Sequence, residues 1–164
     1  MTQQRKVALV TGASRGIGAA IAQQLIQDGF FVVGTATSES GAQKLTESFA
    51  ENGAGAVLDV RNGEAIDALV TDIEQKYGSV LVLVNNAGIT KDNLLLRMSE
   101  DDWDDILNIH LKAVYRLSKR VLKGMTKARL VELLTLVQWL HILQIQAKPT
   151  TQQQKQGLKH SVVV

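Results

Sequence analysis

An apolar run stops in a glycine-spaced turn and continues as an amphipathic segment at Val7-Ala8-Leu9-Val10-Thr11-Gly12-Ala13-Ser14-Arg15-Gly16-Ile17-Gly18. This order predicts a β-strand, a ligand-binding loop and the start of a helix. Glycines let the backbone pass close to a ligand where a Cβ atom would collide, and the free N–H groups of a helix start favour an anion. We therefore expect the turn to bind a pyrophosphate. The alternative is that it only closes an ordinary strand–helix unit.

The spacing of these glycines differs from two common phosphate-binding patterns. Gly12, Gly16 and Gly18 do not form G-x-G-x-x-G, and no Lys follows Gly18 as G-x-x-x-x-G-K-S/T requires. The pattern present is T-G-x-x-x-G-x-G, starting at Thr11.

Composition places the chain among ordinary globular proteins. Its 164 residues suffice for one domain with a single core. With 45% hydrophobic residues, 21% charged residues and a net charge of +2, it lacks the basic character of a nucleic-acid binder. The absence of cysteine excludes disulfides and thiolate metal sites, and the three histidines show no metal-ligand spacing. Without an apolar signal region or a membrane-spanning run, we expect no membrane segment and a cytoplasmic location.

A strand–helix pattern repeats through the first 128 residues. Strands are predicted at Val7–Val10, Phe30–Gly34, Ala56–Val60 and Val80–Val84, and the segments between them carry apolar residues on one helical face. Continuous apolar strands that alternate with such helices predict a Rossmann-like α/β fold, a doubly wound parallel sheet covered on both faces. Four strand–helix units are expected, with a possible fifth strand at residues 133–137.

One longer helix is predicted from about Glu100 to Thr126, and Ser99 with Asp102 is a plausible helix start. Its expected core residues are Trp103, Ile106, Leu107, Val114, Leu117 and Val121.

The end of the second strand bears on cofactor choice. Proteins that prefer NAD usually place Asp or Glu there to hold the ribose 2′-OH. Here residues 34–38 hold no carboxylate, the first acid is Glu39, and Arg15 can reach the same corner. The sequence therefore favours NADP over NAD. Alternatively, residues 35–38 merely cap the next helix, and both roles could hold together.

Polar residues also follow the third and fourth strands. Asp59 is suited to accept a hydrogen bond from an adenine amino group. Asn85 and Asn86 can tie neighbouring strands together, while Ala87 and Gly88 leave room for a ribose. Ligands bind at the carboxyl ends of strands in open parallel sheets, so these residues and the glycine turn are expected to lie together.

These segments resemble the short-chain dehydrogenase/reductase family, and within it the bacterial 3-oxoacyl-acyl-carrier-protein reductases. The resemblance covers residues 1–129 and rests on residues 11–18, 34–38, 85–98 and 115–119. It implies a doubly wound fold, NADP(H), a homotetramer, and hydride delivery to the β-ketone of an acyl chain held on acyl carrier protein in fatty-acid synthesis.

The resemblance also implies a set of cofactor-binding residues. Those of the glycine turn would hold the pyrophosphate and the 2′-phosphate, Thr37 would border the latter, and the others would meet the adenine and its ribose. The set is Gly12, Ala13, Ser14, Arg15, Gly16, Ile17, Gly18, Thr37, Asp59, Val60, Asn86, Ala87 and Gly88.

The catalytic half of the family pattern is not matched. The resemblance implies a Tyr that protonates the forming alkoxide, a Lys four residues later, a Ser that polarises the carbonyl, and an Asn that anchors a water. His110 stands at the Asn position, and no N-Y-S-A-A-K type segment occurs. Tyr115 and Lys119 have the right spacing but match the family's helix, so we interpret them as coincidental. No intact catalytic set is expected, and no metal site.

Residues 130–164 depart from the family, and we interpret them as the family's gene read one base out of frame. Codons can be chosen for a family-like segment, Arg-Phe-Gly-Arg-Ile-Ile-Asn-Ile-Ser-Ser-Val-Val, such that deleting one T shifts the reading frame. The shifted frame then encodes residues 129–140 of this chain. Codons can likewise be chosen for residues 149–156 that encode Asn-Tyr-Thr-Ala-Ala-Lys-Ala when they are read in a frame shifted by one base. Gln138 would then stand at the Ser position, with Thr151 and Lys155 near the Tyr and Lys positions. We expect the tail from about Ala147 to be disordered or poorly packed.

Two functions of different class follow. The first is NADPH-dependent reduction of 3-oxoacyl groups on acyl carrier protein, by descent. The second is a truncated, non-catalytic chain that at best binds NADP weakly, in which case the family's tetramer contacts would be incomplete.

Overall fold

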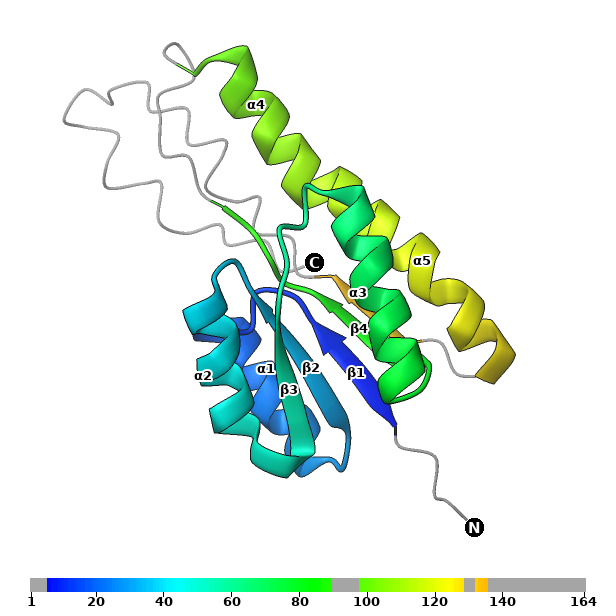
Figure 1. The fold of residues 1–164 in the computed structure, drawn as a ribbon. Coiled ribbons are helices and arrows are strands. Elements are labelled where there is room, and N and C mark those ends of the chain that lie inside the picture. The colour runs from blue at the N-terminus through cyan, green and yellow to red at the C-terminus, as the bar shows by residue number, and fades with distance from the viewer. Residues whose placement is uncertain (1–5, 90–97, 129–131, 136–164) are drawn as a thin grey trace, which may run out of the picture.

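The computed structural model describes residues 6–89, 98–128 and 132–135. Five parallel strands form one sheet in the order β3-β2-β1-β4-β5 (Figure 1). The strands are β1 Val7–Val10, β2 Phe31–Ala36, β3 Gly53–Val57, β4 Val80–Asn85 and β5 Glu132–Thr135. The chain runs outward from β1 to β3 and then crosses to β4 on the other side of β1, so the strand order reverses beside β1. The expected Rossmann-like α/β fold is confirmed. Folds of this type bind ligands at the carboxyl ends of the strands beside such a reversal.

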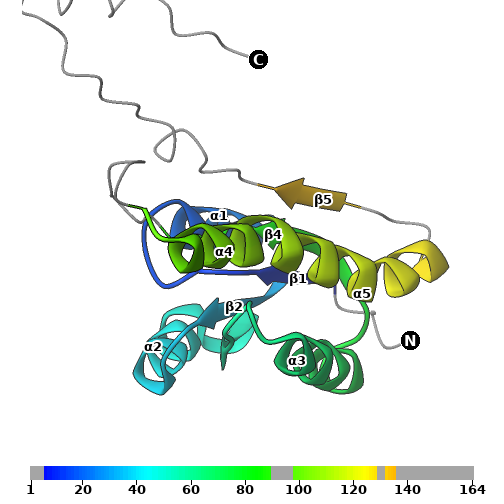
Figure 2. The same ribbon diagram turned by 90° about the horizontal axis from the view of Figure 1, so that it is seen from above.

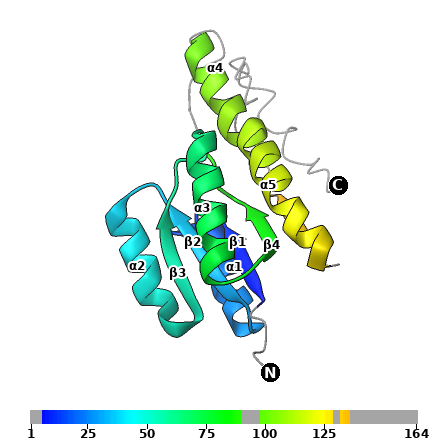
Figure 3. The same cartoon turned by 45° about the vertical axis from the view of Figure 1, so that its right-hand side comes forward.

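Helices cover both faces of the sheet. The helices are α1 Gly16–Gln27, α2 Glu39–Phe49, α3 Gly63–Lys76, α4 Glu100–Leu107 and α5 Ala113–Ala128, with a short 3-10 helix η1 Ala50–Asn52 and a π-helical turn η3 Asn108–Lys112. One core cluster joins α3, η3 and α5 to the sheet, and a second joins α1 and α2 to its other face. Figure 3 shows α3 beside α5, and Figure 2 shows β5 at the outer edge beyond β4.

The central strand explains why the fold forms here. All residues of β1 are fully buried. Val7 and Leu9 belong to the core on the α3 and α5 side, and Ala8 and Val10 belong to the core on the α1 and α2 side. Because side chains alternate along a strand, a continuous apolar run is the pattern of a strand covered on both faces.

The predicted long helix is interrupted by η3. Ser99 caps its start as expected, since its Oγ accepts from the backbone N–H of Asp102 at 3.1 Å. Ile109, Ala113 and Met125 are buried in addition to the expected residues, at the three- and four-residue spacing of one helix face. Ile106, Leu117 and Val121 are buried as expected, and Leu107 and Val114 are half-buried.

The expectation for Trp103 was wrong, because this side chain is 41% exposed. Helix α4 extends past the carboxyl ends of the strands, so the sheet does not lie beneath its first turn (Figure 1).

Strand boundaries also differ from the prediction. Strand β3 was expected at residues 56–60 and lies at Gly53–Val57, while β2 and β4 extend beyond their predicted carboxyl ends. The apolar pattern missed the start of β3 because its first residues are small. They are small because α2 lies close: a Cβ atom on Gly55 would be 1.8 Å from the Ala42 carbonyl oxygen. The buried Leu58 and Val60 follow the strand.

Strand β5 occupies the expected fifth position. It pairs with β4 from Val82 to Asn85, and Asn85 Nδ2 donates to Thr135 Oγ1 at 3.3 Å. The expected strand residues 136 and 137 and the expected disordered tail lie outside the described residues. Over the described ranges, no helix has the length and apolar character needed to cross a membrane, and no group of three or more His, Asp or Glu residues could hold a metal ion.

Candidate functional site

A cleft of about 890 Å³ lies where the carboxyl ends of β1, β2, β3 and β4 meet. It brings together all the cofactor-binding residues expected from the sequence except Ala13 and Gly18. Those that line it are Gly12, Ser14, Arg15, Gly16, Ile17, Thr37, Asp59, Val60, Asn86, Ala87 and Gly88. Residues from four separate segments of the chain therefore share one cavity.

The glycines of the turn have separate tasks. Gly12 and Gly16 adopt φ values of +65° and +60°, in the left-handed region where other residues are strained. Gly18 is needed for close packing, since a Cβ atom there would be 2.3 Å from Asn86 Nδ2 and 2.4 Å from the Gly12 carbonyl oxygen. Gly18 and the fully buried Ala13 thus lie under the turn and do not line the cleft.

Asn86 ties the end of β4 to the glycine turn. Its Nδ2 donates to the carbonyl oxygens of Thr11 at 3.0 Å and Gly12 at 2.9 Å. Thr11 Oγ1 donates to the Val84 carbonyl oxygen and accepts from the N–H groups of Asn86 and Ala87, both at 3.0 Å. The expected tie between neighbouring strands is therefore present, and Thr11 shares it.

The side-chain oxygen of Asn86, like that of Asn85, is left without a donor among the described residues. Asn86 Oδ1 is buried and has no hydrogen-bond partner in the described parts of the chain. A buried acceptor without a donor costs about 1–3 kcal/mol. A donor such as a hydroxyl group that reached this atom from the cleft would satisfy it.

Thr35 is a residue of this site that the sequence did not single out. It is buried at the end of β2, and its Oγ1 accepts from the Gly12 N–H at 3.2 Å. Its carbonyl oxygen accepts from the Ala13 N–H at 2.9 Å. The signal available was a polar residue inside an apolar strand.

Of the two roles expected for the residues after β2, helix capping is observed at Ser38. Ser38 caps α2, because its Oγ accepts from the Gly41 N–H at 3.1 Å. Thr37 is exposed and lines the cleft, as does Arg15. Arg15 makes no ion pair with any residue in the described ranges, so its guanidinium is available to an anion at this corner.

Asp59 forms a hydrogen-bonded ion pair with Arg61, two residues later in the sequence. Arg61 Nη2 lies 2.7 Å from Asp59 Oδ2, and Arg61 Nε donates to both carboxylate oxygens. This hydrogen bonding holds the pKa of Asp59 below its ordinary value of 3.8. Arg61 Nη1 also lies 3.9 Å from Asp105. Neither Arg61 nor Asp105 was expected to line the cleft.

The pair gives a pH prediction. Because the pKa of Asp59 is lowered in the folded state, its stabilising contribution is present above pH 3.8 and is lost as the pH falls through the lowered pKa. Asp59→Asn should therefore reduce stability slightly at pH 7, and the difference from the unaltered protein should shrink toward pH 3. The effect is small because both side chains are about half exposed. Urea unfolding at both pH values measures it, and a difference that grows on acidification would contradict it.

His110 lies on η3 and is buried. Its Nε2 donates to the Ile89 carbonyl oxygen at 3.0 Å. The histidine thus links the segment after β4 to the helix that covers the sheet.

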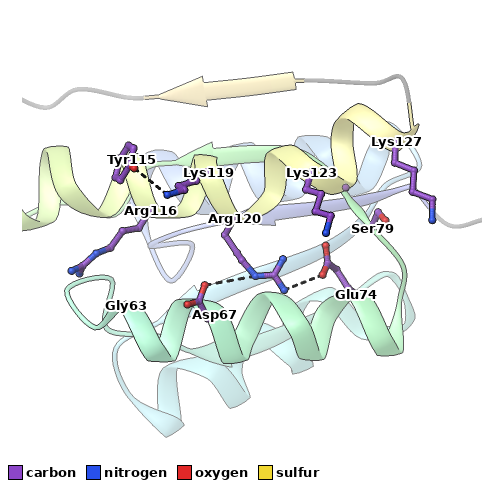
Figure 4. Close-up of a pocket in the computed structure, with 11 residues that line it drawn as sticks. Gly63, Asp67, Glu74, Ser79, Tyr115, Arg116, Lys119, Arg120, Lys123 and Lys127 are labelled. Atoms are coloured by element: carbon purple, nitrogen blue, oxygen red, sulfur yellow. Dashed lines mark hydrogen bonds and ion pairs between the residues drawn. The ribbon is translucent and has the colours of Figure 1, made fainter.

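Tyr115 and Lys119 lie in a different place. Lys119 Nζ donates to Tyr115 Oη at 3.3 Å, and Tyr115 is 61% exposed. They line a groove of about 800 Å³ between α3 and α5, where Arg120 reaches Asp67 and Glu74 (Figure 4). No residue that lines this groove lines the cleft. This separation supports the interpretation that their spacing is coincidental.

Comparison with known proteins gives a consistent relationship. A family model described as short chain dehydrogenase matches residues 6–133. The chain is 58% identical over 132 residues to 3-oxoacyl-(acyl-carrier-protein) reductase FabG of Pseudomonas aeruginosa, covering 79% of this chain and 53% of that protein. It is 48% identical over 136 residues to the protein of the same name from Escherichia coli K12, covering 83% and 56%.

A solved structure shows the same relationship. A short-chain dehydrogenase from Streptomyces avermitilis matches with a TM-score of 0.76 and 34% identity, over 82% of this chain and 50% of that chain. The chain spans about half the length of the curated relatives it matches. The family model matches residues 6–133 of the 164 residues of this chain, and the fold agrees with it. The chain therefore belongs to the short-chain dehydrogenase family.

Proposed function

We propose that this chain carries the NADP(H)-binding part of a 3-oxoacyl-acyl-carrier-protein reductase. Such an enzyme transfers a hydride from NADPH to the ketone carbon of a 3-oxoacyl group, and a proton delivered to the ketone oxygen completes the 3-hydroxyacyl group and leaves NADP. The observation that carries the proposal is the cleft, which gathers the glycine turn, a carboxylate-free corner beside Arg15, and the unsatisfied Oδ1 of Asn86. The relatives' names supply the substrate class.

The residues present fit a dinucleotide with a 2′-phosphate. The turn allows close approach because Gly12 and Gly16 carry no side chain, and α1 begins at Gly16 with its N–H groups free for a pyrophosphate. Arg15 and Thr37 would border the 2′-phosphate, and Asn86 Oδ1 would accept from a ribose hydroxyl. NADPH bound there would supply the hydride.

A second candidate function is cofactor binding without catalysis. We favour it for this polypeptide itself, as distinct from the enzyme family it descends from. The sequence holds no N-Y-S-A-A-K type segment. The spacing that mimics it, Tyr115 with Lys119, lies in the groove between α3 and α5 and away from the cleft. For the reductases from which this chain descends, we propose acyl carrier protein as the partner, a homotetrameric assembly and a cytoplasmic location.

Arg15→Ala tests the cofactor assignment. A charge-assisted hydrogen bond to the 2′-phosphate is worth about 1–3 kcal/mol, so the variant should bind NADP roughly 5-fold to 150-fold more weakly. Binding of NAD, which lacks this phosphate, should change much less. Isothermal titration measures both, and Lys44→Ala is the matched control because it removes an exposed positive charge that does not line the cleft. Equal affinity of the unaltered chain for NADP and NAD would count against the proposal.

A further inference from the structure

The groove between α3 and α5 concentrates positive charge. Its volume of about 800 Å³ is in the range of small-molecule sites. Helix α3 contributes two carboxylates to its lining, and α5 contributes five cations. The cations are Arg116, Lys119, Arg120, Lys123 and Lys127. The groove therefore carries more positive charge than the net +2 of the whole chain, and it attracts anions.

One cation already serves both carboxylates. Arg120 Nη2 donates to Glu74 Oε2 at 3.1 Å and to Thr71 Oγ1 at 3.0 Å, and Arg120 Nε lies 3.7 Å from Asp67 Oδ1. The Arg120 and Glu74 side chains are only 27% and 28% exposed, so this cluster forms a wall that joins the two helices. Because both acids share this one arginine, the other four cations are left to an external anion.

The four remaining cations form no ion pair with any residue in the described ranges. Lys119 Nζ donates to a neutral group, Tyr115 Oη, at 3.3 Å. Arg116 Nη1 donates to a backbone carbonyl oxygen at 2.9 Å, which leaves further donors on its guanidinium. Lys119, Lys123 and Lys127 follow one another at intervals of four residues. Like charges at this spacing destabilise a helix, and an anion bound between them would relieve the repulsion.

The spacing of the lysines indicates the class of anion. Lys119 and Lys127 are separated by about 12 Å along the helix axis, at 1.5 Å per residue. Lys123 lies between them and is directed into the groove (Figure 4). A single small anion can reach only part of such a row, whereas linked phosphate groups carry charge along it. Lysine binds phosphate as a point charge and needs no fixed angle.

We propose that the groove between α3 and α5 binds a linear chain of phosphate groups, held by Arg116, Lys119, Lys123 and Lys127. The chain can be a free oligophosphate or the triphosphate of a nucleotide, because the cations recognise the phosphates alone. This site does not rest on the proposed function, since no residue that lines the groove lines the cleft.

Inorganic triphosphate and ATP are the probes, and isothermal titration gives their dissociation constants. The test variant combines Lys119→Gln with Lys123→Gln. Its control combines Lys44→Gln with Lys112→Gln, which removes the same charge from exposed positions that do not line the groove. Arg116 is left unaltered because it also bonds to the loop beside the cleft.

We expect the test variant to bind triphosphate about fivefold to thirtyfold more weakly, the range of two exposed ion pairs. The control should stay within about twofold of the unaltered chain, and added salt should weaken binding by screening the charges. Equal affinity for ATP and triphosphate would assign the site to the phosphate chain alone, and tighter binding of ATP would assign it to a nucleotide.

Three outcomes would overturn the proposal. Equal weakening in both double variants would show attraction by net charge without a site. Loss of binding in Arg15→Ala, with none in the test variant, would place the phosphates in the glycine turn of the cleft. Failure of the unaltered chain to bind triphosphate at millimolar concentration would exclude the site, and would leave NADP binding in the cleft to be judged by its own titration. Circular dichroism of each variant verifies that its fold is retained.

Discussion

The purified chain is expected to oxidise no NADPH with acetoacetyl substrates above the rate in buffer. We expect a gene with one base inserted near codon 130 to encode a protein that does. The physical reason is that we find no segment matching the one in which the family resemblance implies the catalytic Tyr and Lys, and no match for its Ser. A positioned general acid or base typically contributes about 10²-fold to 10⁴-fold, so loss of the group should leave the rate at background.

Two measurements bear on this expectation. Absorbance at the NADPH band compares the two proteins, and the gene sequence shows whether an alternative frame encodes the Tyr and Lys segment. Tyr115→Phe in the frame-restored protein should leave the activity unchanged, because Tyr115 lies in the groove between α3 and α5. Activity in the chain as written that Tyr115→Phe abolishes would overturn our interpretation of Tyr115 and Lys119. Absence of any such frame would refute the frame-shift hypothesis.

Gly55→Ala is expected to lower the free energy of unfolding by about 3 kcal/mol, the upper end of the usual range for overpacking. The new Cβ atom would lie 1.8 Å from the Ala42 carbonyl oxygen and 2.7 Å from its carbon. Both atoms belong to the backbone of α2, so no side chain can rotate to make room, and α2 must move away from β3.

A second glycine gives the matched control. A Cβ atom on Gly63, the first residue of α3, would meet its nearest neighbour, Arg116 Cζ, at 3.4 Å, an ordinary contact. Gly63→Ala should therefore be neutral or slightly stabilising, because alanine favours a helix. Urea unfolding followed by circular dichroism measures both variants, and equal midpoints for Gly55→Ala and the unaltered chain would refute the close contact.

The parts of the fold that sequence predicted well carry local signals. Strand β1 and the start of α1 follow from an apolar run and the glycine turn, and Ser99 and Ser38 are capping residues at helix starts. The clefts of such sheets lie at strand ends, so the residues after β1, β2 and β4 could be grouped before their distances were known.

The parts that sequence missed depend on contacts between distant segments. The small residues of β3 make sense only once α2 lies on them, and the π turn at η3 has no signal in apolar spacing. Arg61 lies only two residues from Asp59, but their pairing depends on a loop conformation that Arg116 of α5 helps to hold. Periodicity reports which face of an element is apolar, and it does not report how two backbones approach.

The strand order has a consequence for the order in which the chain assembles. In the sheet, β1 pairs with β2 and β2 pairs with β3, and each pair is consecutive in the sequence. Strand β4 instead pairs with β1, from which it is separated in the sequence by β2, β3 and the helices between them. Closing a longer loop costs more entropy, and contacts between distant residues form more slowly. We therefore expect β1 to β3, with α1 and α2, to form before β4 docks. The cleft is complete only after that step, because Asn86 must first reach Thr11. A dinucleotide that contacts Asn86 would bind only chains that have passed this step, and would slow their unfolding.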